Sequence, residues 1–134
     1  MPGFGLKNGN TVFLTSKATG QNLRVHPDGR VDGHGGEGKL AQWTVHRVDK
    51  DTVKFENKNN GNWLRIEKDG DLNGLGKGGP LTEFKLIKHK DDREISLRSA
   101  HHEGHVGVLP DGAPKNAHNT GTGPHGRFTV KVHA

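Results

Sequence analysis

The chain of 134 residues carries one short motif three times. Residues 23–33 read LRVHPDGRVDG, and residues 64–74 read LRIEKDGDLNG, 41 positions later. A shorter copy, VGVLPDG at residues 106–112, follows after another 42 positions. A period near 40 with strand-like content indicates a repeat architecture, and it limits the possible folds before any single motif is considered.

Each repeat contains candidates for four short strands separated by turns. In the first repeat, Leu23 and Val25 alternate with Arg24, which is the period-two pattern of a half-buried strand. The Pro-Asp-Gly sequence that follows favours a tight turn, because proline presets φ and glycine accepts a positive φ. No helix of useful length is predicted. The strands predicted in this repeat cover residues 11–16, 22–26, 30–32 and 42–48.

Three four-stranded units of this size can close a six-stranded barrel and cap it with three hairpins. The sequence therefore predicts an all-β fold, a pseudo-threefold β-trefoil. Trp43, Phe84 and Phe128 are equivalent by register and are expected to meet near its axis. We expect a single domain over residues 11–134, preceded by a flexible, glycine-containing arm over residues 1–10. Its three repeats are expected at residues 11–51, 52–92 and 93–134.

The composition supports a turn-rich β protein. Only 28% of the residues are hydrophobic and 21 are glycine, which disfavours a helical bundle. The absence of cysteine excludes a disulfide scaffold, a thiolate metal site and a thiol nucleophile. No window approaches the roughly 18 apolar residues of a membrane span, and no signal peptide is recognised. The expectation is a soluble protein, either cytoplasmic or exported without a signal peptide.

The charge of the chain is positive but dispersed. The net charge is +5, which suits a polyanionic partner. The 20 lysines and arginines are scattered among 15 acidic residues, whereas a nucleic-acid interface needs a denser basic stripe. No specific nucleic-acid partner is predicted.

Residues 23–33 resemble the corresponding stretch of the fibroblast growth factors, and residues 106–112 resemble the approach to their last glycan-binding loop. The looser pattern of Gly-x-x-Leu, Gly-x-Val and aromatic-x-Val/Leu is similar to that of hisactophilin and the fascin domains, which bind actin. The resemblance covers residues 11–132 and implies the β-trefoil fold. It does not imply one function, because such folds serve as growth factors, lectins, inhibitors and actin binders.

Motifs for catalysis and cofactors are not supported by their context. Two Gly-x-Gly-x-x-Gly patterns, at residues 33–38 and 74–79, precede strand entries rather than a helix, so no nucleotide site is predicted. The HHEGH sequence at residues 101–105 has its glutamate misplaced for a zinc protease, and a solvated hairpin turn is expected there. We predict no metal, no cofactor and no enzymatic activity.

The predicted function is a non-enzymatic module that binds a glycan or sulfated polysaccharide through its loops. The loop at residues 113–127 supplies the hydrogen-bonding and cationic candidates. Trp63 is either an exposed platform for a sugar ring or a cover for its own hairpin. The alternatives are an F-actin-binding protein of the hisactophilin or fascin type and a growth-factor-like ligand of a cell-surface receptor. The candidate ligand-binding residues are Trp63, Lys115, Asn116, His118, Asn119, Thr120, His125 and Arg127.

Overall fold

The computed structural model describes residues 5–89 and 93–133, and these are all-β. The connections include four single-turn 3-10 segments, η1 to η4, at Lys39–Ala41, Pro80–Thr82, Ala117–Asn119 and Pro124–Gly126. No helix in the described part of the chain has the length and apolar content needed to cross a bilayer. The strands are β1 Thr11–Ser16, β2 Asn22–Val25, β3 Val31–Gly35, β4 Trp43–Arg47, β5 Thr52–Asn57, β6 Trp63–Ile66, β7 Leu72–Gly76, β8 Phe84–His89, β9 Glu94–Ser99 and β10 Phe128–Val132.

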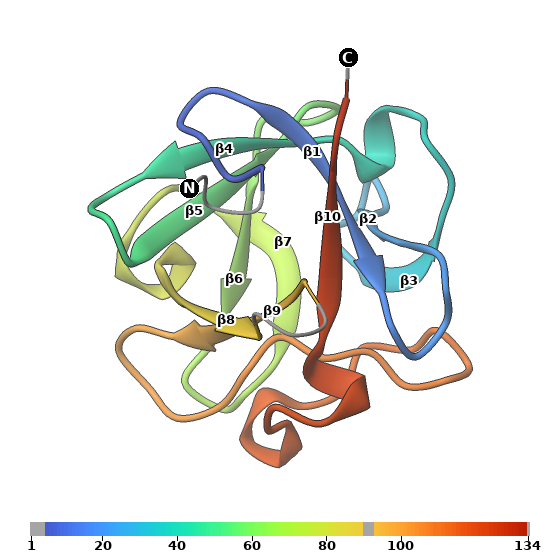
Figure 1. The fold of residues 1–134 in the computed structure, drawn as a ribbon, viewed down its shortest axis with the longest axis vertical. Coiled ribbons are helices and arrows are strands. Elements are labelled where there is room, and N and C mark those ends of the chain that lie inside the picture. The colour runs from blue at the N-terminus through green and yellow to red at the C-terminus, as the bar shows by residue number, and fades with distance from the viewer. Residues whose placement is uncertain (1–4, 90–92, 134) are drawn as a thin grey trace.

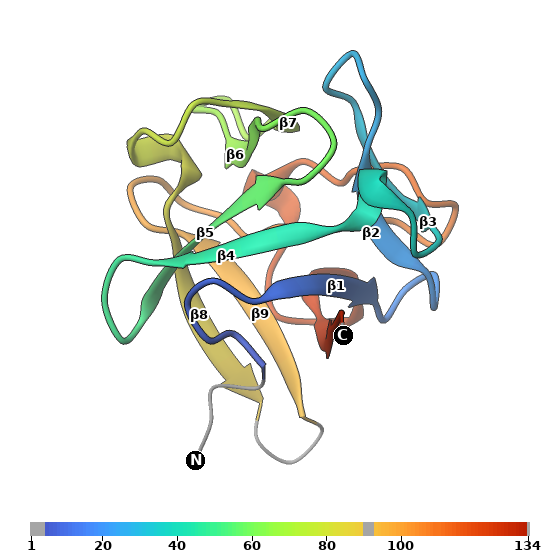
Figure 2. The same ribbon diagram turned by 90° about the horizontal axis from the view of Figure 1, so that it is seen from above.

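Six strands close an antiparallel barrel (Figure 1). Around the ring, β1 pairs with β10, β10 with β9, β9 with β8, β8 with β5, β5 with β4 and β4 with β1. Two further hairpins, β2–β3 and β6–β7, extend this sheet from β1 and β5. Figure 2 shows the β6–β7 hairpin and the turn between β2 and β3 at one end of the molecule.

The predicted aromatic residues share the core of this barrel. Trp43, Phe84 and Phe128 are fully buried and belong to one hydrophobic cluster. Trp43 Nε1 donates a hydrogen bond of 3.0 Å to the Leu23 carbonyl. This bond gives the buried indole N–H an acceptor in place of water. Each large buried side chain contributes roughly 1.5–3 kcal/mol to stability by leaving water.

The prediction of a β-trefoil built from three equal four-stranded repeats is wrong. The structure is a closed six-stranded barrel with two added hairpins, and the third repeat contributes only β9 and β10 to it. Where the other repeats form a hairpin, residues 106–114 form a single isolated bridge, between Val108 and Pro114. Gly107 stands where the first two repeats have Arg24 and Arg65, and it has no side chain for a cross-strand pair. The repeated sequence therefore does not produce a repeated hairpin.

Part of the segment expected to be a flexible arm packs against the barrel. Leu6 is fully buried in the core. Arg47 Nε donates to the Leu6 carbonyl at 2.7 Å, and the Gly9 N–H donates to the Val45 carbonyl at 2.8 Å. Residues 5–10 thus follow a defined path on the barrel, and residues 1–4 lie outside the described residues.

Candidate functional site

Three turns, each with a glycine of positive φ, lie close together, and a backbone hydrogen bond joins each turn to another repeat. Gly29, Gly70 and Gly112 have φ between 90° and 93°, a conformation that favours glycine. A Cβ at Gly112 would meet the His34 ring, and one at Gly29 would meet the Leu75 side chain. The turns are joined by three backbone hydrogen bonds of 2.8 Å, from Gly33 to Gly112, from Gly74 to Gly29 and from Ala117 to Gly70.

A cavity of about 550 Å³ lies between these turns, and we call it the turn cavity. Its apolar lining includes Leu75, which is 41% exposed, together with Ala113 and Pro114. Its polar lining is mainly acidic. The charged and histidine side chains that line it are His26, Asp28, Arg30, Asp32, His34, Glu67, Asp71 and Asp111.

Asp32 is the most strongly held of these carboxylates. It accepts from Arg24 Nε at 2.9 Å, from the backbone N–H of His34 at 2.9 Å, and lies 2.6 Å from His26 Nε2. Burial raises the pKa of Asp32, but the hydrogen bonds from Arg24, His26 and the His34 N–H, with the Arg24 charge, outweigh it and lower the pKa to about 2. Asp32 is therefore an ionised structural group at neutral pH.

The second repeat builds the same place with different groups. Arg65 Nε donates to Asn73 Oδ1 at 2.9 Å, as Arg24 donates to Asp32. The Asn73 amide nitrogen then donates to Glu67 at 2.6 Å and to Asp71 at 2.8 Å. Because Asn73 is buried and all these groups are paired, this network fixes the wall of the turn cavity.

The 113–127 loop brings together two of the residues predicted from the sequence. Lys115 Nζ lies 3.1 Å from His125 Nδ1, a distance at which the ammonium donates to a neutral imidazole. Both side chains are half-buried and line a cavity of about 160 Å³. The other residues lining this loop cavity are Gly121, Gly123, Pro124 and Gly126, so its lining among the described residues contains no acidic side chain.

Other predicted residues in the loop hold the backbone. The Asn116 side chain accepts from the His118 N–H at 2.9 Å and donates to the Asp69 carbonyl at 3.0 Å. Thr120 is only 4% exposed, and its hydroxyl donates to the Asn116 carbonyl at 2.9 Å. His118 and Asn119 have exposed side chains on η3. Asn116 is exposed as well, but its amide group is bonded to the backbone on both sides.

Arg127 and Trp63 are engaged elsewhere. Arg127 Nη1 lies 3.3 Å from the buried carboxylate of Glu94, which also accepts from Lys17 at 2.8 Å. The half-buried Trp63 ring contacts the His46 ring, with the ring centroids 4.5 Å apart and the planes tilted by 44°, and Lys54 Nζ lies 5.7 Å from the Trp63 centroid. Trp63 thus packs against β4 and β5, which matches a cover for its hairpin better than a free platform.

Two of the histidines of the HHEGH sequence at residues 101–105 bond to other parts of the chain. His101 lies 3.0 Å from Glu83, and the His105 ring lies 2.9 Å from the Thr120 carbonyl. No group of three metal-ligating side chains gathers anywhere in residues 5–89 and 93–133. The turn cavity was not predicted from the sequence, because the turn of each repeat was considered on its own. The threefold turn motif was the signal that these turns could meet.

No protein-family model matches this chain, and no curated protein sequence matches it significantly. The functional interpretation therefore depends on the residues and cavities described above.

Proposed function

We propose that this protein is a non-enzymatic binding module for sulfated or otherwise acidic glycans, with its site in the 113–127 loop. The observation that carries the proposal is the facing pair of Lys115 and His125, 3.1 Å apart in the loop cavity. Two basic side chains in contact with each other in a cavity whose described lining has no carboxylate suit an anionic ligand. An incoming sulfate or carboxylate oxygen would accept from the ammonium in place of the imidazole.

The shape of the loop cavity favours close approach of such an oxygen. Three of the lining residues are glycine, which places backbone rather than side chain next to the bound group. The exposed side chains of His118 and Asn119 are available for sugar hydroxyl groups.

The loop is held in place before any ligand binds. The Val108 N–H donates to the His125 carbonyl at 2.9 Å, and the Ser96 hydroxyl donates to the Gly126 carbonyl at 2.7 Å. The Lys115 N–H donates to the Gly107 carbonyl at 3.0 Å. A loop fixed in this way loses little conformational entropy on binding, which favours affinity from a small number of contacts.

The test is elution from a heparin column with a salt gradient at pH 7, beside an array of neutral and acidic glycans. Lys115→Gln is expected to weaken binding roughly three- to tenfold, which corresponds to the net loss of about one hydrogen bond. The matched control is Lys77→Gln, which removes the same charge from an exposed side chain bonded to Asn62.

The control separates a site from general attraction to a basic protein. Equal losses in Lys115→Gln and Lys77→Gln would mean that heparin responds only to net charge, and the loop site would be rejected. Array signals confined to neutral glycans would also contradict the proposal.

A further inference from the structure

We infer that the turn cavity is a second binding site, for a small organic cation that carries an apolar body. The inference rests on three features: a cavity of about 550 Å³, an exposed apolar wall, and two lining carboxylates that have no cationic partner among residues 5–89 and 93–133. This site is separate from the proposed glycan site, which is basic.

The charges around the turn cavity do not balance. The Arg30 guanidinium lies 2.8 Å from Asp28, and Arg24 and His26 hold Asp32. Glu67 lies 3.5 Å from Arg65. These pairs account for three of the five carboxylates that line the cavity.

Asp71 and Asp111 are the two that remain. Asp71 accepts from the neutral amide of Asn73, and Asp111 accepts from the Ala113 N–H. Neither has a cationic partner within the part of the chain that the structure describes. His34 faces the same turn, but its Nε2 lies 2.6 Å from the Asp111 carbonyl oxygen, not from the carboxylate. The cavity is thus locally negative on a chain whose net charge is +5.

The wall below these carboxylates is apolar. Leu75 is 41% exposed and lies against the turn at Gly29, and Ala113 and Pro114 continue this lining. The volume falls in the range of roughly 300–1,000 Å³ that small-molecule sites occupy. An ammonium ion alone would leave this apolar surface wet, whereas an ammonium on an aromatic or aliphatic body matches both parts of the lining.

The cavity is formed in the absence of any ligand. Its three turns are joined by backbone hydrogen bonds of 2.8 Å, and Asn73 fixes the positions of Glu67 and Asp71. A preformed site of this kind needs no rearrangement when the cation enters.

The probes are phenethylamine, which is cationic at pH 7, and the neutral 2-phenylethanol, which has the same apolar body. We would titrate each into ¹⁵N-labelled protein in low salt and follow the amide signals. Phenethylamine is expected to shift amides in residues 28–34, 71–75 and 111–113. The alcohol is expected to bind about fivefold more weakly, which is the scale of exposed ion pairing at low ionic strength.

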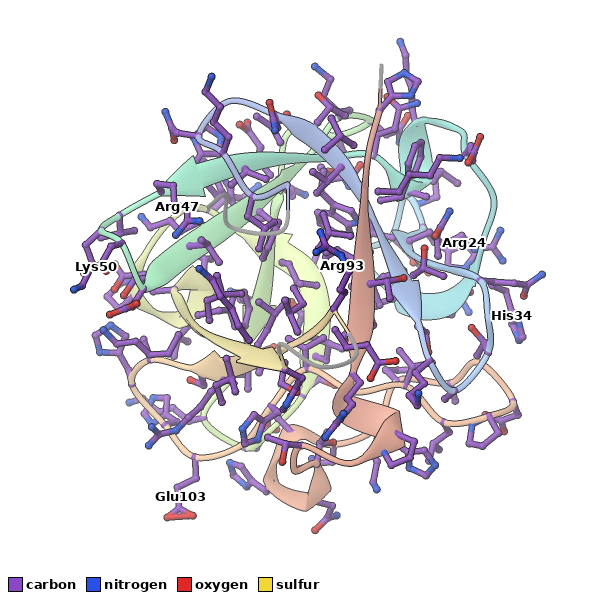
Figure 3. All side chains as sticks on the ribbon, in the orientation of Figure 1. Arg24, His34, Arg47, Lys50, Arg93 and Glu103 are labelled. Atoms are coloured by element: carbon purple, nitrogen blue, oxygen red, sulfur yellow. The ribbon has the colours of Figure 1, made fainter. Side chains whose placement is uncertain are left out.

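The variants remove charge but keep shape. Asp71→Asn combined with Asp111→Asn is expected to weaken phenethylamine binding about fivefold and to leave 2-phenylethanol binding unchanged. Glu103→Gln is the control, because this exposed glutamate points away from the molecule on a different side from Arg24 and His34 (Figure 3). Lys115→Gln should not alter phenethylamine binding, which distinguishes this site from the glycan site.

Several results would overturn the inference. Equal affinity for the amine and the alcohol would show an apolar pocket without selectivity for a cation. Shifts outside the three turns, or no shifts at all, would remove the site. If the double variant does not fold, the unmodified protein still decides: added NaCl must weaken binding of the amine and leave that of the alcohol unchanged.

Discussion

The Asp32 carboxyl is expected to supply a measurable part of the pH dependence of folding. Burial raises its pKa, and the hydrogen bonds from Arg24, His26 and the His34 N–H, with the Arg24 charge, more than reverse this, so the folded value is about 2 against 3.8 for the free group. Between these values the unfolded chain binds more protons than the folded one. The contribution of Asp32 to stability is therefore complete above about pH 5 and is lost as the pH falls toward 2.

The size of this contribution follows from the two pKa values. One pKa unit corresponds to about 1.4 kcal/mol, so a fall from 3.8 to about 2 is worth about 2 kcal/mol between pH 5 and pH 2. The Asp32 side chain is only 19% exposed, so solvent screening reduces this figure little.

The assay is urea unfolding of the wild type and Asp32→Asn at pH 5 and at pH 2. The wild type should lose about 2 kcal/mol more stability than the variant across this interval. The other carboxyl groups are the same in both proteins, so their contributions cancel in the comparison. Glu103→Gln should lose as much as the wild type. If Asp32→Asn loses as much as the wild type does, the network around Asp32 does not stabilise the fold in this way.

Two further substitutions test the packing of the turns and the buried ion pair. Gly112→Ala should destabilise the protein by about 1–3 kcal/mol in urea unfolding, because alanine disfavours a φ of 90° and its Cβ would meet His34. The control is Gly36→Ala, which should change stability little because a Cβ there meets nothing within 4 Å. Similar losses of stability in the two variants would contradict this reason. Glu94→Gln should destabilise the protein at pH 7, because hydrogen bonds from Lys17 and Arg127 outweigh burial and lower the Glu94 pKa. This loss of stability should shrink on acidification, when Glu94 of the wild type is protonated. A loss of stability that does not vary with pH would assign the effect to packing alone.

The strands of the first two repeats were predictable because their patterns are local. Residues 11–16 form β1 as predicted, and the strand predicted at residues 42–48 is present as Trp43–Arg47. Alternation of buried and exposed side chains and the turn glycines act within a few residues, so one sequence displays them. The third repeat was not predictable in the same way, because Gly107 stands at the position of Arg24 and Arg65 and offers no side chain to pair across the strands.

The candidate site was predictable only in part, because a sequence does not reveal which polar side chains are already bonded. Lys115 and His125 are brought together in the loop cavity. Asn116, Thr120 and Arg127 have the same polar character, yet they bond to the backbone or to Glu94. The turn cavity depends on contacts between turns about 40 residues apart, which no local pattern encodes.

The loss of the third hairpin and the basic character of the loop have one cause. In the first two repeats an arginine on one strand bonds to the residue opposite it, as Arg24 bonds to Asp32 and Arg65 to Asn73. Gly107 occupies the arginine position in the third repeat and faces Lys115, so that residue has no cross-strand side chain to bond. The Lys115 side chain instead reaches His125.

The same glycine also makes room for the loop. A Cβ at Gly107 would meet the Thr120 side chain, so an arginine there is incompatible with the observed path of residues 113–127. Restoring the motif at this position would favour a hairpin at the expense of the loop cavity. The residues that depart from the repeat therefore form the loop cavity with its basic lining, while the repeated turns form the turn cavity with its acidic lining.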